Sequence, residues 1–310
     1  KGATAARHEQ LADEGAARVL LESQLPFDVI DTEADFGSYR VLILPDRIRM
    51  DAALAAKVNA FLAAGGRAIL SHLSGLAADR DAFVVGTGLV PRGESPWTND
   101  FIAVRDGLAE GMVRSPFVTY RKAMMVEPGT ATVLADAWKP YFNRDYNHFC
   151  SHQHTPYASL ADYPAVLQAG PVIYFAHPIF SLYRQVGQPL YKQLVINALR
   201  VLMPEGLPVT SNLPSTARLS LMRQGRQLIL HVLHAVPVKR GASPHNPNSV
   251  IEVIEDKLPL RDVDLCVRVG TPVRRVFDPV SGREQPFAQA GDRVALHLDR
   301  VDLHEMLVME

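Results

Sequence analysis

The residues best suited to chemistry lie close together where the chain reads NHFCSHQH, from Asn147 to His154. Within it, four candidate ligands alternate with other residues: His148, Cys150, His152 and His154. On an extended strand, alternate side chains lie on one side, and imidazoles with a thiol are ligands that zinc and copper use. Neighbouring alternate ligands rarely reach one ion, however, because their Cβ atoms are about 7 Å apart. We therefore predict a polar, cleft-lining loop with no metal or cofactor, and keep a metal site at these residues as the alternative.

Cys150 also raises the question of a covalent hydrolase, because a thiol next to imidazoles can be activated as a thiolate. A catalytic elbow would place the nucleophile between small residues, as in Gly-x-Cys-x-Gly or Gly-x-Ser-x-Gly, and neither motif occurs. Ser74 before Gly75 is only half of one. Glycosidases need two carboxyl groups around the scissile bond, and nothing marks such a pair among the 33 acidic residues. The catalytic residues stay unknown, and whether the chain is an enzyme stays open.

Two further histidines follow predicted strands. His72 comes after a strand that ends near Ser71, and His177 follows another at Val172–Ala176. Ligands of open α/β sheets bind beyond the carboxyl ends of the strands, and hydrogen-bonding groups around aromatic rings suit a sugar. We hypothesise that both histidines converge on one surface, which would fail if they lay on opposite edges. The alternative is that they only cap strand ends. The loop residues expected to join them in lining a cleft are Tyr141, Asn143, Arg144, His148, Cys150, His152 and His154.

The elements that would position these groups are clearest between Tyr39 and Gly75. Val41–Leu44 is a continuous apolar run that predicts a buried strand. The next helix, at residues 51–64, has one apolar stripe, with Asp51 as N-cap and Gly65-Gly66 as its stop. A second buried strand starts at Ala68. This pattern predicts a βαβ unit of a parallel sheet.

Other helices and strands are predicted on both sides of this unit. A helix at Thr4–Gln24 with Thr4 as N-cap precedes a short strand at Phe27–Ile30. Residues 76–170 look irregular and predict a loop-bearing insertion, with strands at 122–126 and 131–135. A strand at Val172–Ala176 leads into a helical region that ends at Met203. We therefore expect an α/β domain at residues 1–204, with a flavodoxin-like parallel sheet and helices on both faces.

Beyond Pro204-Glu205-Gly206 the pattern changes to short strand-like runs separated by turns. Ala217–Met222 and Gln227–Val232 flank a turn and predict a hairpin. A polar loop is expected at residues 238–248. Further short strands at this spacing predict a small antiparallel β-sandwich at residues 205–310.

Composition sets the wider limits. The 310 residues are 47% hydrophobic and 21% charged, with a net charge of −1, which is ordinary for a globular protein. A near-neutral chain gives no basic surface for nucleic acid. Its two cysteines form no disulfide framework, and no apolar run is long enough to span a membrane. We expect the cytoplasm by default and no membrane partner, although the first residue, Lys1, is consistent with a trimmed N-terminus.

The amino-acid sequences of two segments resemble those of a known family. Leu20–Arg40, followed by a segment ending LPD, a helix, AGGRAIL and Ser-Gly, resembles the trimerisation domain of glycoside hydrolase family 42 β-galactosidases. The segment Pro140–Pro156 is more similar to related glycoside hydrolases of the α-amylase or α-L-fucosidase type.

The resemblance implies a class I glutamine-amidotransferase-like fold and the C-terminal region of an enzyme whose catalytic barrel lies before this domain. No catalytic residue of the family maps onto this chain, which has too few residues for an eightfold βα barrel as well. It therefore implies a non-catalytic role: assembly into a homo-oligomer such as a trimer, and shaping of a carbohydrate cleft. The alternatives are a hydrolase that uses Cys150 and its histidines, or a sugar- or metal-binding module.

Overall fold

The computed structural model describes residues 10–310, except for the side chains of residues 247 and 248. These residues form two compact units. One holds the described residues up to Val19 and Val29–Glu205, and the other holds Leu20–Asp28 and Gly206–Glu310. No helix within the described residues has the length and apolar character needed to cross a membrane.

The first unit contains the predicted βαβ element, which is confirmed. Strand β1 (Val41–Leu44) pairs in parallel with β2 (Arg67–Ser71), and α3 (Ala52–Ala63) connects them. The Asp51 carboxylate accepts a hydrogen bond of 2.8 Å from the backbone N–H of Leu54, so it caps the helix as predicted. The chain leaves the helix through Gly65, whose φ of 94° favours glycine.

These strands belong to a seven-stranded mixed sheet with the order β1-β2-β9-β8-β7-β4-β5. Its other members are β9 (Val172–Phe175), β8 (Tyr157–Ala169), β7 (Thr132–Pro140), β4 (Phe101–Val104) and β5 (Phe117–Val118). Only β1, β2 and β9 are parallel, and the other four strands are antiparallel to their neighbours. The predicted parallel sheet is thus limited to three strands. The reason is connection length: a tight turn at Gly170 joins β8 to β9, whereas a parallel neighbour needs a long crossover.

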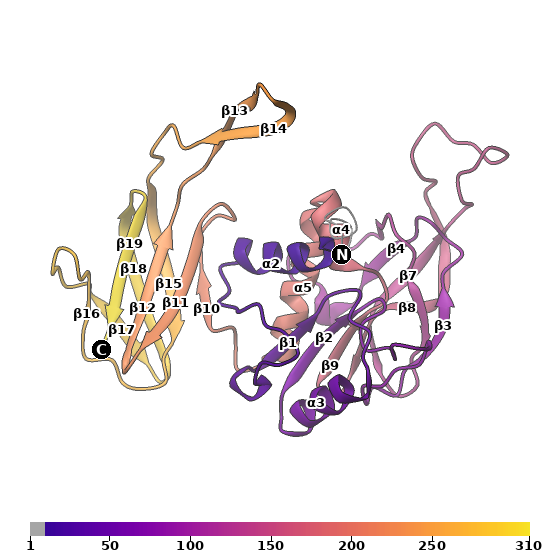
Figure 1. Cartoon of the computed structure of the whole chain (residues 1–310), viewed down its shortest axis with the longest axis horizontal. Coiled ribbons are helices and arrows are strands. Elements are labelled where there is room, and N and C mark those ends of the chain that lie inside the picture. Colours follow the sequence, from indigo (N-terminus) through magenta and orange to yellow (C-terminus); the bar gives the residue numbers. More distant parts are fainter. Residues whose placement is uncertain (1–9) are drawn as a thin grey trace. The chain divides into compact units, whose positions relative to one another are not determined.

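Helices cover the parallel part of this sheet. They are α2 (Leu11–Glu22), α4 (Ile179–Val186) and α5 (Pro189–Leu202) in addition to α3. In the view of Figure 1, α3 lies below the parallel strands and α4 and α5 lie above them. Gly15 of α2 approaches α4 so closely that a Cβ would lie 2.0 Å from the carbonyl oxygen of Phe180. The predicted N-cap Thr4 lies outside the described residues.

The segment 76–170 is more regular than its sequence indicates. The predicted strands near 122–126 and 131–135 exist as β6 (Met124–Glu127) and the start of β7, and β6 pairs with β3 (Val90–Glu94). The same segment also supplies β4, β5 and β8 to the main sheet. In contrast, the predicted strand at Phe27–Ile30 is wrong, because these residues form no ladder. Two short 3₁₀ turns, at Phe36–Ser38 and Asp106–Leu108, complete the unit.

The second unit contains two small four-stranded antiparallel sheets and a separate hairpin. One sheet has the order β10 (Val209–Ser211), β15 (Leu260–Arg268), β18 (Arg293–Val301), β17 (Phe287–Ala290). The other has the order β11 (Arg218–Gln224), β12 (Gln227–Leu233), β19 (His304–Met309), β16 (Val276–Phe277). Residues of both sheets, such as Leu230 and Leu296, share one hydrophobic core.

Two predictions for this unit, a hairpin and a polar loop, can be compared with the structure. The predicted hairpin is confirmed, since β11 and β12 pair up to Gln224 and Gln227 around Gly225. The predicted polar loop at 238–248 is wrong. These residues enter a hairpin of β13 (Val238–Ser243) and β14 (Asn246–Val253), a two-stranded sheet of its own. The turn is formed by Pro244 and His245, and the prolines and asparagines of residues 244–248 obscured the strands in the sequence.

Candidate functional site

The carboxyl ends of β2 and β9 bring two of the predicted site residues together. Ser71 and Phe175 are partners in the parallel ladder, and the N–H of His72 donates to the carbonyl of Phe175 at 2.8 Å. His72 and His177 therefore follow neighbouring strands at one edge of the sheet. The opposite-edge arrangement that would have ended the hypothesis does not occur.

His177 belongs to a buried polar network. Its Nε2 lies 2.6 Å from Oδ1 of Asp100, and the Tyr163 hydroxyl donates to Oδ2 of the same carboxylate at 2.7 Å. The hydroxyl groups of Thr119 and Ser95 extend it, Thr119 by donating to Asp100 and Ser95 by pairing with Tyr163 at 2.8 Å. All five side chains are buried. Burial, followed by the Asp100 carboxylate, raises the pKa of Tyr163, so this phenol stays a neutral donor.

His72 is held in an unusual backbone conformation beside this network. Its φ is 49°, it is 9% exposed, and its Nε2 lies 4.0 Å from a carboxylate oxygen of Glu94. Burial, followed by the nearby His177 and Arg121, lowers its pKa to about 4. His72 is therefore a neutral imidazole near pH 7. Nε2 of His72 and Nδ1 of His177 are both buried without a protein hydrogen-bond partner.

Asp46, the aspartate of the LPD motif, stabilises the carboxyl end of the parallel strands. Asp46 is fully buried with a φ of 48°, and its carboxylate accepts hydrogen bonds from the Ser71 hydroxyl and the backbone N–H of Ser181, both at 2.7 Å. The second bond satisfies an N–H at the start of α4. Burial raises the pKa of Asp46. This residue fixes β1, β2 and α4 relative to one another, which makes its role architectural.

The loop between β7 and β8 carries the remaining predicted residues. It is coloured pink in Figure 1 and extends away from the strands that it joins. Arg144 lies over the ring of Phe149, 5.0 Å from its centroid, and Tyr141 and Tyr146 are 68% and 99% exposed. The carboxylate of Asp145 accepts backbone hydrogen bonds that hold the loop in turns. The extended strand assumed for the metal alternative is therefore not formed.

The alternating histidines and Cys150 do not converge. His148 contacts Asp145 at 3.3 Å, whereas the ring of His154 packs against Phe101 and Tyr120 and has a pKa lowered by burial. Among residues 10–310, no group of three or more His, Cys, Asp or Glu side chains is placed to hold a metal ion.

The environment of Cys150 also gives no nucleophile. Its thiol donates to the backbone carbonyl of His152 at 3.2 Å and not to an imidazole. Asn143 is a loop anchor, because its side chain bonds the N–H of Thr98 at 3.0 Å and the carbonyl of Pro96 at 2.8 Å.

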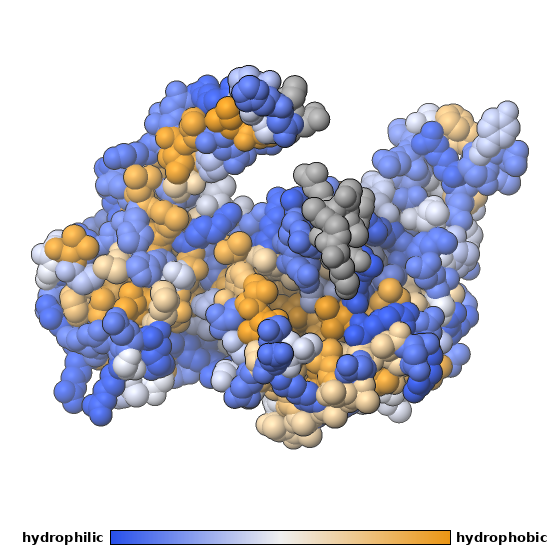
Figure 2. All heavy atoms as spheres, viewed as in Figure 1, coloured by the Kyte–Doolittle hydropathy of each residue, from blue (hydrophilic) through white to orange (hydrophobic). Residues whose placement is uncertain are grey.

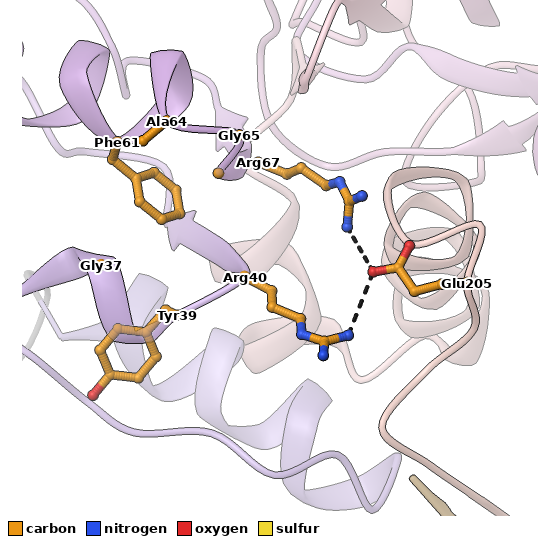
Figure 3. Close-up of a pocket in the computed structure, with 9 residues that line it drawn as sticks. Gly37, Tyr39, Arg40, Phe61, Ala64, Gly65, Arg67 and Glu205 are labelled. Atoms are coloured by element: carbon orange, nitrogen blue, oxygen red, sulfur yellow. Dashed lines mark hydrogen bonds and ion pairs between the residues drawn. The ribbon is translucent and has the colours of Figure 1, made fainter. Parts of the chain in front are cut away.

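A cavity of about 300 Å³ lies at the other end of the parallel strands. Figure 3 shows Arg40 and Arg67 directed at one carboxylate, that of Glu205, at 3.5 and 2.8 Å. Arg67 lowers the pKa of Glu205. Phe61 and Tyr39 line the same cavity. Glu205 is the last residue of the first unit. We therefore interpret the two ion pairs as holding the end of this unit in place, and not as part of the predicted site.

The sequence pattern predicted His72 and His177 as site residues, but it did not predict the buried polar network around His177. Asp100, Thr119 and Tyr163 stand near short or interrupted strands, and no local motif links them. The only usable signal was their position before or within apolar runs, such as FIAV at 101–104.

Comparison with known proteins assigns part of this chain to a family. Residues 18–91 match the family model of the beta-galactosidase trimerisation domain. This trimerisation-domain segment confirms the predicted resemblance. The curated Beta-galactosidase GalA of Bacillus licheniformis is 36% identical over 69 residues, which are 22% of this chain and 10% of that protein.

Solved structures extend the likeness over both units. The alpha-L-fucosidase isoenzyme 2 from Paenibacillus thiaminolyticus matches 97% of this chain with 34% identity and a TM-score of 0.90, but only 45% of the fucosidase is covered. The beta-galactosidase from Bacillus circulans sp. alkalophilus matches 96% of this chain at 16% identity and a TM-score of 0.56, with 38% of that protein covered. The second comparison shows a shared fold. In both cases this chain spans less than half of the related protein.

Proposed function

We propose that this chain is the non-catalytic oligomerisation and accessory region of a carbohydrate-active glycoside hydrolase. One observation carries the proposal: nearly the whole chain, 97%, superimposes on less than half of an alpha-L-fucosidase. The trimerisation-domain segment at residues 18–91 supports it. Residues 1–204 would be a class I amidotransferase-like, flavodoxin-like domain, and residues 205–310 a β-sandwich domain.

The hairpin β13–β14 offers the surface for assembly into a homo-oligomer. Figure 2 shows hydrophobic residues gathered along this arm. Six aliphatic side chains on it and just after it are 40–57% exposed: Val238, Val250, Ile251, Val253, Ile254 and Leu258. A two-stranded hairpin is marginally stable alone in water, and clustered exposed aliphatic groups mark interaction sites. A second copy of this chain would cover them.

The β7–β8 loop is the part that would shape a carbohydrate cleft. The loop exposes the rings of Tyr141, Tyr146 and Phe149, and the guanidinium of Arg144 lies over the Phe149 ring. Sugar sites combine such apolar platforms with hydrogen-bonding groups. Asn143 holds one end of the loop against the connection between β3 and β4, and His154 packs the other end against Phe101 of β4. A rigid base with an exposed tip is the arrangement expected of a loop that contributes to a binding surface.

Sedimentation equilibrium over a range of protein concentrations tests the assembly. Wild type is expected to form a concentration-dependent oligomer, and the double variant Val250→Lys/Ile254→Lys to be a monomer, because lysine cannot be buried unpaired in an apolar interface. Val280→Lys is the matched control, since Val280 is 84% exposed on a turn of the same unit. A wild-type monomer at the highest concentration would reject the proposal.

A second measurement separates an accessory region from a complete enzyme. The intact mass of the native polypeptide should exceed the 34.1 kDa of this chain by roughly the size of a barrel domain. A matching mass would instead favour an independent role for this chain.

A further inference from the structure

Two histidines face each other on the second unit, where the proposed function gives them no role. His231 lies on β12 and His304 on the adjacent strand β19, and both strands are labelled in Figure 1. Nδ1 of His231 is 3.0 Å from Nε2 of His304. The rings are stacked, with centroids 5.2 Å apart and an interplanar angle of 14°.

The pairing of the strands fixes this geometry. His231 is directly opposite Met306, and His304 is two residues before Met306 on the same strand. Because alternate residues of a strand share one face, all three side chains lie on the same side of the sheet. The opposite side carries Leu230 and Leu307, which are buried in the core of this unit. The imidazole pair is thus held on the solvent-facing side of a rigid ladder.

We propose that His231 and His304 form a two-imidazole binding site for a divalent first-row transition-metal ion such as Zn²⁺ or Cu²⁺. Neutral imidazole is a ligand that these ions prefer. Solvent would complete the coordination, and the thioether of Met306 lies on the same face as a soft additional ligand.

The distance between the nitrogens fits a shared ion. Two nitrogens each about 2.0–2.1 Å from one tetrahedral zinc ion are about 3.3 Å apart. The observed separation of 3.0 Å must grow by a few tenths of an ångström, and both rings must turn so that the two lone pairs meet at the ion. In the free protein one ring donates to the other across this contact; in the metal-bound state that ring would carry its proton on its other nitrogen.

The site differs from the alternating loop histidines in that its two ligands already meet. It is also smaller than the groups of three or more ligands that are lacking among residues 10–310.

Isothermal titration of the full chain with ZnCl₂, repeated with CuCl₂, tests the site. Wild type is expected to show one saturable event per chain. His231→Gln and His304→Gln should each weaken that event by roughly 100-fold, because one imidazole loses the advantage of simultaneous binding. The double variant His148→Gln/His152→Gln is the control, since it removes two exposed histidines of the first unit and should bind like wild type.

A second readout guards against a folding defect in the variants. Calorimetric unfolding with and without ZnCl₂ should show a metal-dependent rise in the Tm of wild type and of the control, and none in His304→Gln. Far-ultraviolet circular dichroism should be unchanged in the variants without metal. Equal titration curves for wild type and His304→Gln would overturn the proposal, as would loss of the event only in the control.

Discussion

The buried imidazole of His72 predicts a specific acid sensitivity of the first unit. Its pKa is 6.5 in an unfolded chain and about 4 in the folded protein. Between these values the unfolded state binds more protons, so stability is complete above pH 6.5 and decreases as the pH falls towards 4. About 1.5 pH units of this window lie above pH 5, which corresponds to about 2 kcal/mol lost by pH 5.

The variant His72→Asn removes this proton-binding group with little change to the backbone. His72 has a φ of 49°, and asparagine is among the residues that tolerate this left-handed conformation. We expect wild type to lose about 2 kcal/mol more than His72→Asn when the pH is lowered from 7.5 to 5. His152→Asn, in the exposed loop, should keep the wild-type pH dependence.

Urea unfolding followed by tryptophan fluorescence measures this difference in the right unit. Both tryptophans, Trp97 and Trp138, lie in the first unit, so the signal reports its unfolding. Equal pH dependence of wild type and His72→Asn would refute the reasoning, because it would mean that His72 is protonated as easily in the folded protein as in the unfolded chain.

Substitutions at three further positions test the packing of this unit by the same urea assay. Asp51→Ala should cost about 1 kcal/mol by removing the helix cap, and Asp51→Asn much less. Gly15→Ala should cost roughly 1–3 kcal/mol, because the added methyl group meets the Phe180 carbonyl; no loss would mean that α2 and α4 do not pack as described. Asp100→Ala should cost roughly 3 kcal/mol or more by leaving buried His177 without its carboxylate, and an unchanged midpoint would contradict a structural role for that pair.

Local patterns predicted those parts of the fold that short-range physics controls. Asp51 and Gly65 mark the ends of α3 in the sequence because capping and left-handed turns involve only neighbouring residues. The strands at Val41–Leu44 and Val172–Phe175 are recognisable as continuous apolar runs, because the second is buried on both faces and the first on one face, with its other face partly buried. The edge shared by His72 and His177 then follows from the parallel order of the strands.

The antiparallel half of the sheet was not predictable in the same way. Strand β8 begins with exposed residues and becomes buried only after Asp162, so neither a continuous apolar run nor an alternation describes it. Its pairing with β7 also contains several register shifts. The formation of this strand depends on the strands that it pairs with and not on a local sequence pattern.

The same distinction explains why the sequence predicted only part of the candidate site. His72 and His177 carry a sequence signal because each follows a buried strand. Asp100 instead contacts His177 from the residue before β4, and β4 is separated from β9 in the sheet by β7 and β8. A buried carboxylate with partners on three separate segments holds those segments at fixed distances. We argue that this network provides a rigid base for the β7–β8 loop, because β7 and β8 lie between the strands that it ties together. A loop that contributes to a carbohydrate surface needs such a base if its exposed aromatic rings are to keep one position.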